Sequence, residues 1–158
     1  FIAGWAKSGK KNAFPVAKGI IHHEQIGTVM DLYSTILETT GAKNPTDHVV
    51  DGVSLIKQFS DKENSDRPDH FMCHFPHSHR SSHFTAFRKG DWKLIYRYKG
   101  KAKYELYDLE NDPYEKSNLA EREPKKLKGM TQAMIARLEK EDALYPVDGE
   151  NELKPDLP

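Results

Sequence analysis

Histidine is the side chain most able to do chemistry in this sequence, because five of the eight histidines lie between positions 70 and 83. Imidazole is the commonest zinc ligand, and near neutral pH it also donates hydrogen bonds to anions. The spacing matches no closed zinc site, and the adjacent Cys73 and His74 cannot easily bind one ion. A metal-binding module therefore stays an alternative interpretation of the five residues, which are His70, His74, His77, His79 and His83.

The other reactive residues fit no catalytic pattern. Cys73 is the single cysteine, so an internal disulfide is excluded, and its place in a predicted strand indicates a buried or half-buried thiol. A later acidic group lacks the glycine and the twelve-residue spacing of an EF-hand, although it could suggest a calcium loop; it contains Asp108, Glu110, Asp112 and Glu115. No Ser-His-Asp arrangement or Gly-rich phosphate loop is present. We therefore expect neither catalytic residues nor metal ligands in this chain.

The histidine-rich segment belongs to a series of four predicted strands. Alternating apolar residues and turns at Gly90 and Gly100 place them at 70–75, 83–88, 92–98 and 104–109. In the third strand one face carries Trp92, Leu94, Tyr96 and Tyr98. Pro124 then begins a predicted helix to about Leu144, whose apolar stripe is Leu127, Met130, Met134, Leu138 and Leu144. The predicted fold is α+β, with a small antiparallel sheet packed on one long helix.

The first sixty residues have a different pattern. An apolar strand at 1–6 is followed by a polar loop. A predicted helix begins near Thr28, which forms a capping box with Asp31, and this helix ends at Gly41. One face of this helix is apolar, carrying Val29, Leu32, Tyr33, Ile36 and Leu37. A short helix ends near Phe59. These elements are typical of the end of a larger α/β domain, and the missing initiator Met together with a strand at position 1 predicts a fragment.

The polar run 60–69 is the predicted boundary between the two parts. We expect domains at 1–60 and 67–145, followed by a loosely ordered acidic tail at 146–158. Twenty-four basic and 24 acidic residues cancel, so no overall field favours nucleic acid or an anionic membrane. No apolar stretch approaches the roughly 20 residues of a membrane span. We therefore expect neither kind of partner.

Several motifs, in order and nearly spanning the chain, resemble the C-terminal third of sulfatases of the alkaline phosphatase superfamily. The first is an apolar strand that ends in Trp, Phe1 to Trp5, followed by the loop Lys7 to Asn12. The next two are Asp31-Leu32-Tyr33-Ser34-Thr35 and Asp51-Gly52-Val53-Ser54-Leu55. A His-aromatic-Pro-His segment follows as His74-Phe75-Pro76-His77, and then Arg88-Lys89-Gly90-Asp91-Trp92-Lys93-Leu94-Ile95. The last are Glu105-Leu106-Tyr107-Asp108-Leu109 and the run 111–120. One departure is Ala6-Lys7-Ser8-Gly9, where the family has Pro-Gly after the Trp.

This resemblance implies hydrolysis of sulfate esters on a carbohydrate or aryl substrate, with a formylglycine nucleophile and calcium as cofactors. The residues that hold them would lie upstream of this chain, so the chain alone is expected to be inactive, and the missing N-terminal catalytic domain would be its partner. Cys73 does not fit the formylglycine motif, because Pro76 comes one position too late. Alternatives are a phosphodiesterase or phosphonate hydrolase of the same superfamily, or a structural module. The family suggests a periplasmic, secreted or lysosomal protein.

The resemblance also implies that the segment 74–77 reaches the rim of the sulfate pocket. We expect His77, then His74 and His79, to bind the sulfated substrate, a small molecule or glycan, because imidazole donates to both sulfate and hydroxyl oxygens. Strand alternation predicts that Phe75 points the other way, into the core. The apolar helix face and the open strand edge at 1–6 predict self-association of the chain when it is alone.

Overall fold

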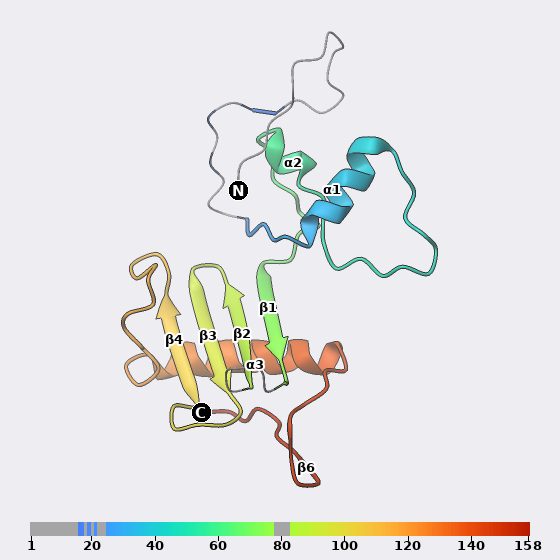
Figure 1. Cartoon of the computed structure of the whole chain (residues 1–158). Helices are drawn as coiled ribbons and strands as arrows, with labels where there is room; N and C mark the ends of the chain where they lie inside the picture. Colours follow the sequence, from blue (N-terminus) through green and yellow to red (C-terminus); the bar gives the residue numbers. More distant parts are fainter. Residues whose placement is uncertain (1–15, 18, 20, 22–24, 78–82) are drawn as a thin grey trace. The chain divides into compact units, whose positions relative to one another are not determined.

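The computed structural model describes residues 16–17, 19, 21, 25–77 and 83–158, which form two compact units divided after Asp69 (Figure 1). The strand expected at 1–6 and the loop after it lie outside the described residues. We call the residues up to Asp69 unit 1 and those from His70 onward unit 2. The ranges 1–60, 67–145 and 146–158 stay a prediction about the domains of the intact protein.

Unit 2 is a four-stranded antiparallel sheet with one long helix across a face (Figure 1). The strands are β1 (His70–Phe75), β2 (Phe84–Lys89), β3 (Trp92–Arg97) and β4 (Tyr104–Asp108), paired in the order β1-β2-β3-β4. The helix is α3 (Pro124–Lys140). Each strand pairs with its neighbour in sequence, and Gly90 takes the left-handed conformation (φ 57°) in the turn between β2 and β3. The predicted α+β architecture is confirmed.

The core of unit 2 lies between the sheet and α3. Phe87, Leu94 and Leu106 stand opposite one another on adjacent strands, so their side chains form a row on the helix-facing side. The apolar stripe of α3 covers this row, and Leu94, Leu106, Met134 and Leu138 are fully buried. The packing expected from strand alternation and helical spacing is therefore confirmed.

The end of α3 differs from the sequence-based expectation. The helix ends at Lys140, and Leu144 is 77% exposed, so the prediction that Leu144 belongs to the buried stripe is wrong. The chain leaves the helix at Asp142, which takes a left-handed conformation (φ 49°). The Ala143 N–H then bonds back to the Leu138 carbonyl at 3.0 Å, which closes the last turn.

The tail of unit 2 is more defined than its composition predicts. Strands β5 (Val147–Asp148) and β6 (Asn151–Glu152) form a short hairpin. Beyond it, Asp156 hydrogen-bonds to side chains of the main sheet. The tail was expected to be loosely ordered because it is polar and contains several prolines, but a single acidic residue finds basic and phenolic partners there.

Unit 1 contains helices α1 (Asp31–Thr40) and α2 (Ile56–Phe59). Gly41 ends α1 in the left-handed conformation (φ 71°), as predicted. Only half of the predicted capping box forms, because the Thr28 hydroxyl bonds to the Asp31 carboxylate and not to the helix backbone. No helix in the described part of the chain is both long and apolar enough to cross a membrane.

The apolar face of α1 is mostly exposed to solvent. The buried residues of the helix are the polar Asp31 and Thr35, on another face. Val29, just before the helix, is 77% exposed and Ile36 is 60% exposed. This matches the expectation that the helix presents apolar surface, which the described part of unit 1 leaves exposed. Patches of this kind mark interaction sites.

The first testable prediction concerns the core. Leu94→Ala removes a fully buried side chain from the centre of the sheet–helix contact, so we expect the free energy of unfolding to fall by about 2–5 kcal/mol. Urea-induced unfolding followed by circular dichroism measures this change. The matched control is Leu144→Ala, the same substitution at an exposed position, which should stay within about 0.5 kcal/mol of wild type. Equal effects of the two variants would contradict the described core.

Candidate functional site

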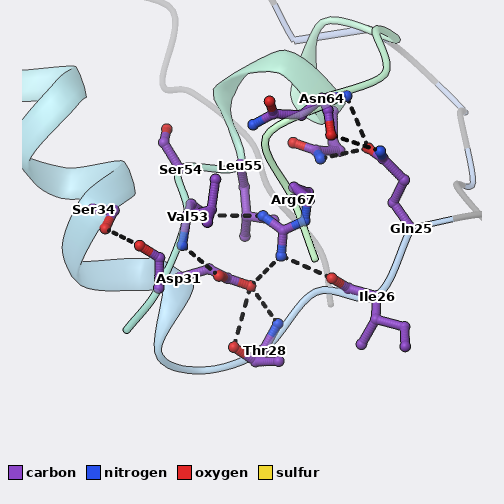
Figure 2. A network of polar contacts seen from close by, with 12 residues as sticks. Gln25, Ile26, Thr28, Asp31, Ser34, Val53, Ser54, Leu55, Asn64 and Arg67 are labelled. Atoms are coloured by element: carbon purple, nitrogen blue, oxygen red, sulfur yellow. Dashed lines mark hydrogen bonds and ion pairs between the residues drawn. The ribbon is translucent and has the colours of Figure 1, made fainter. Parts of the chain in front are cut away.

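Unit 1 is organised around a buried ion pair between Asp31 and Arg67, whose side chains are each 4% exposed. Figure 2 shows the two groups pointing at one another, with Arg67 Nη2 2.6 Å from Asp31 Oδ2. The guanidinium also donates to the Val53 carbonyl at 2.8 Å and the Ile26 carbonyl at 2.7 Å. Arg67 therefore joins three separate segments of unit 1 through one planar group.

The Asp31 carboxylate accepts from two backbone N–H groups as well. Thr28 donates to Oδ2 at 2.6 Å, and Val53 donates to Oδ1 at 2.9 Å. Burial by itself would raise the pKa of Asp31, but these backbone bonds and the Arg67 guanidinium outweigh burial and lower the pKa below its ordinary value. Asp31 is therefore ionised at neutral pH and acts as a fixed acceptor.

The two motifs that begin at Asp31 and Asp51 interlock through their backbones. The Ser34 hydroxyl donates to the Gly52 carbonyl at 2.7 Å, and the Leu55 N–H donates to the Thr35 hydroxyl at 3.0 Å. A side chain at Gly52 is impossible, since a Cβ there would lie 2.1 Å from the Met30 carbonyl oxygen. The motif residues thus hold α1 against the segment that leads into α2.

A second polar contact fixes the chain before α1. Gln25 Nε2 donates to the Asn64 carbonyl at 2.9 Å, and the Asn64 N–H returns a bond to Gln25 Oε1 at 3.0 Å (Figure 2). Gln58 donates to the same Gln25 oxygen at 2.7 Å. In these bonds and in the ion pair, the polar side chains of unit 1 bind one another and nearby backbone groups. They therefore hold the backbone segments of unit 1 together.

Arg67 was not predicted as a functional residue, because it lies in the polar run 60–69 that was expected to be a domain boundary. Nothing in the sequence distinguishes it from the other charges there, such as Asp61 and Lys62. The signal that could have found it is the Asp31 motif, because a carboxylate on a buried helix face needs a cationic partner.

His74 uses both ring nitrogens inside unit 2. Nε2 lies 2.7 Å from the Leu144 carbonyl, which can only accept, so Nε2 carries a proton. Nδ1 lies 2.8 Å from the hydroxyl of Thr85, which is fully buried, and that hydroxyl lies 2.9 Å from the Tyr98 hydroxyl. His74 thereby ties the end of β1 to the segment that follows α3.

The prediction that Phe75 points into the core is wrong. Phe75 stacks on Phe84 (ring centroids 5.8 Å apart), whereas His74 stands opposite the buried Thr85. Alternation correctly places neighbouring residues on opposite faces, but α3 covers the face that carries His74. For the same reason Cys73 is exposed, so its expected burial is also wrong.

His77 is exposed at the end of β1 and makes an edge-on ring contact with Phe75 (centroids 5.9 Å apart). His79, the third expected substrate ligand, lies outside the described residues. The structure thus places His74 and His77 three positions apart at one end of β1, the first bonded within the unit and the second open to solvent.

The residues described do not fit a metal site. Among them, no group of three or more His, Cys, Asp or Glu side chains lies close enough to hold an ion. In the acidic segment, Asp108 accepts from the Glu110 N–H and the Asn111 side chain, and Asp112 accepts from the Ser117 N–H. These carboxylates shape the turns after β4.

Asn118, in the last motif, organises the same region. Its Oδ1 accepts from the N–H groups of Leu106 and Ala120, each at 3.0 Å, and its Nδ2 donates to the Tyr104 carbonyl at 3.2 Å. The motif after β4 therefore works by pairing backbone groups, as expected from its turn-forming residues.

The chain belongs to the family described as N-sulphoglucosamine sulphohydrolase, C-terminal, whose model matches residues 14–143. It therefore carries a sulfatase C-terminal domain. The ordered motifs of the sequence analysis predicted this family, and the match confirms it.

Known proteins agree with this assignment. The N-acetylgalactosamine-6-sulfatase of Mus musculus is 40% identical over 53 residues, which are 34% of this chain and 10% of that protein. An uncharacterized sulfatase of Schizosaccharomyces pombe is 32% identical over 123 residues, 70% of this chain and 21% of that protein. This chain thus spans about a fifth or less of these relatives' lengths.

A solved structure shares the fold. It is a protein in complex with its substrate D-glucosamine-2-N,6-O-disulfate, and it is 26% identical with a TM-score of 0.57. The match covers 71% of this chain and 24% of that one.

The second prediction tests the ion pair. Asp31→Asn leaves the Arg67 guanidinium buried without a counter-charge. The free energy required for local unfolding of unit 1 should therefore fall by about 3–5 kcal/mol. Hydrogen exchange of the Leu55 N–H, which bonds to Thr35, measures this free energy. The matched control is Asp66→Asn, which breaks the exposed pair with Lys57 (3.5 Å) and should cost about 0–1 kcal/mol. Unchanged protection of Leu55 in Asp31→Asn would contradict the central role of the pair.

The third prediction concerns pH. Because folding lowers the pKa of Asp31, its contribution to stability is complete above the ordinary value of about 3.9. That contribution is lost as the pH falls through the lowered pKa of the folded state. The free energy of opening at Leu55 should therefore decrease below about pH 4 in wild type and in Asp66→Asn. Asp31→Asn should show a flatter profile, and an identical slope in all three proteins would refute the assignment.

Proposed function

We propose that this chain is the C-terminal part of a sulfuric ester hydrolase. The observation that carries the proposal is the family match over residues 14–143, which contains the interlocked motifs at Asp31 and Asp51. In this proposal the intact protein removes sulfate, and the present chain contributes structure and part of the substrate pocket. Assaying the intact gene product on sulfate esters tests it directly.

The substrate is a sulfated carbohydrate, and we favour an amino sugar over an aryl sulfate. Two observations support this choice: the mouse relative is named for N-acetylgalactosamine 6-sulfate, and the solved neighbour holds a glucosamine disulfate. Both proteins act on a hexosamine bearing a sulfate group. A phosphodiesterase or phosphonate hydrolase of the same superfamily stays the alternative.

The cofactors implied by the resemblance are formylglycine and calcium, and we place both in the rest of the protein. There, a formylglycine made from a Cys or Ser side chain would supply the nucleophile, and a bound calcium ion would polarise the sulfate oxygens. The described residues do not form a metal site. In this proposal the chain binds and positions the substrate and covers part of its pocket. By itself it should hydrolyse an aryl sulfate no faster than the buffer blank.

The exposed apolar face near α1 is the proposed contact with the rest of the α/β domain. Val29 and Ile36 are mostly exposed, and Leu32 and Tyr33 are each 40% exposed, so the face has apolar area to bury. The ion pair of Asp31 fixes the opposite side of the helix. Self-association of the isolated chain through this face follows from the same surface.

His77 is the residue we propose for contact with the sulfated substrate. It is exposed, and its imidazole can donate to a sulfate oxygen or a sugar hydroxyl. His74 comes second, because both of its ring nitrogens are already bonded within unit 2 and hold the end of β1. His79 stays a third proposed ligand.

The fourth prediction tests His77 in the intact enzyme. His77→Ala should lower kcat/KM on the sulfated sugar by about tenfold or more, the loss of one charge-assisted bond, and should leave folding unchanged. The control is His48→Ala, an exposed histidine of unit 1 that also makes an edge-on ring contact, with Tyr33. That variant should keep the wild-type rate.

Three outcomes would count against parts of the proposal. A wild-type rate for His77→Ala removes His77 from the site. Faster turnover of a phosphonate monoester than of any sulfate ester favours the alternative function. Hydrolysis by this chain alone, surviving repurification, contradicts the placement of the catalytic residues elsewhere.

A further inference from the structure

The tail of unit 2 places one carboxylate, that of Asp156, on three donors at the turn end of the β3–β4 hairpin. The Lys103 ammonium lies 2.5 Å from Oδ1 and 2.7 Å from Oδ2, so it bridges both oxygens. The Tyr96 hydroxyl donates to Oδ1 at 3.1 Å. The Tyr104 hydroxyl lies 2.9 Å from the Asp156 carbonyl and 3.3 Å from Oδ1. Figure 1 shows the C-terminus beside this hairpin.

Two of the three donors belong to strands of the sheet, and Lys103 directly precedes β4. Tyr96 and Tyr104 are direct partners in the β3–β4 register, and their rings meet edge to face at 5.4 Å. Tyr96 is 2% exposed, and the Lys103 ammonium lies over its ring, 5.8 Å from the centroid. The sheet therefore fixes the two phenols beside one another, and preorganised donors of this kind bind an anion at low entropic cost.

Both phenols act as donors at neutral pH. Burial raises the pKa of Tyr104 to about 12 and raises that of Tyr96 as well, with Asp156 adding to both shifts. The hydrogen bond from Lys103 lowers the pKa of Asp156, so the carboxylate is charged. Two protonated hydroxyls and an ammonium thus surround one anion.

Asp156 is held less firmly than the donors are. Its side chain is 61% exposed, and residues 153–158 lie in no helix or strand. A segment of this kind can leave its position without disturbing the sheet beneath. The donors would then face solvent, where another anion can reach them.

An open pocket of about 620 Å³ adjoins the donors. Lys103 and Tyr104 belong to its lining, together with Lys101, Asn118 and Glu121. The Lys101 side chain offers a further polar contact to a hydroxyl-rich ligand, and the volume falls within the usual range for small-ligand sites. An anionic group on the three donors would therefore have space beside it for the body that carries it.

We propose that Tyr96, Lys103 and Tyr104 form a binding site for the sulfate half-ester of a saccharide, and that Asp156 occupies it as an internal competitor. A sulfate half-ester carries one negative charge on three terminal oxygens, which accept from the same donors as a carboxylate does. The choice of a saccharide rests on the proposed function, whereas the anion site rests on the donors alone. No bond is made or broken, so the site binds and releases.

While Asp156 occupies the site, no other anion can bind, so the apparent Kd equals the intrinsic Kd divided by the fraction of time that the site is empty. If Asp156 fills the site for about nine-tenths of the time or more, removing it should lower the apparent Kd about tenfold or more. The test compares binding of D-glucosamine 6-O-sulfate to wild type and to Asp156→Ala, followed by NMR shifts of the Lys103 and Tyr104 amides. Adding Lys103→Ala to Asp156→Ala should abolish the gain.

The matched control is Asp148→Ala, which removes the same charge from the same tail at an exposed residue 3.7 Å from Lys99. It should bind as wild type does. His77→Ala in the Asp156→Ala background should also leave the shifts unchanged, so failure of the proposed His77 role and failure of this site are distinguishable. Circular dichroism confirms that each variant is folded.

The outcomes separate the sources of the anion. Tighter binding of the sulfated sugar to Asp156→Ala than of inorganic sulfate or unsulfated glucosamine supports the proposal. Equal binding of inorganic sulfate and the sulfated sugar overturns the saccharide assignment. Equal affinity of wild type and Asp156→Ala, or an equal gain in Asp148→Ala, overturns the competition by Asp156.

Discussion

The buried ion pair between Asp31 and Arg67 is the contact on which unit 1 depends. The described part of this unit buries little apolar surface, with Leu55 and Ile56 its buried large apolar residues. Its segments are joined through the Arg67 guanidinium and the Asp31 carboxylate, which bind backbone groups from both sides of α1. A buried pair adds little net stability over apolar packing, but it penalises every arrangement that separates the charges. The pair thus specifies one arrangement of a unit that has little core.

Unit 2 is built on the opposite principle. A row of apolar side chains across three strands packs against the apolar stripe of α3. The polar contacts described above lie at the ends of this core. His74, Thr85 and Tyr98 form a bonded chain at one end, and Tyr96 and Tyr104 meet Asp156 at another. The apolar centre makes the sheet rigid, so these polar groups keep fixed positions. Both the His77 segment and the Asp156 contact depend on that rigidity.

The sequence predicted most of unit 2 because strand alternation and helical spacing are strong there. Leu94 and Met134 fall at the expected positions of the core. It favoured the wrong face of β1, because Phe71, Cys73 and Phe75 share one face whereas α3 covers the face with His70, Met72 and His74. This explains the errors at Cys73 and Phe75. Arg67 and Asp156 were missed because a charged residue in a polar run gives no sign of its partner. The motifs indicated the family, and several of their polar side chains, such as those of Ser34, Thr35 and Asn118, bond to backbone groups.

The bond between the His74 ring and the Leu144 carbonyl has a consequence for biosynthesis. The two residues are 70 positions apart, so the bond cannot form until nearly all of unit 2 has left the ribosome. The four strands pair between sequence neighbours and can assemble as hairpins during translation, but their apolar face stays uncovered until α3 arrives. A partly made sheet of this kind exposes apolar surface and is prone to aggregation. Closure of β1 onto the segment after α3 is then among the last steps of folding.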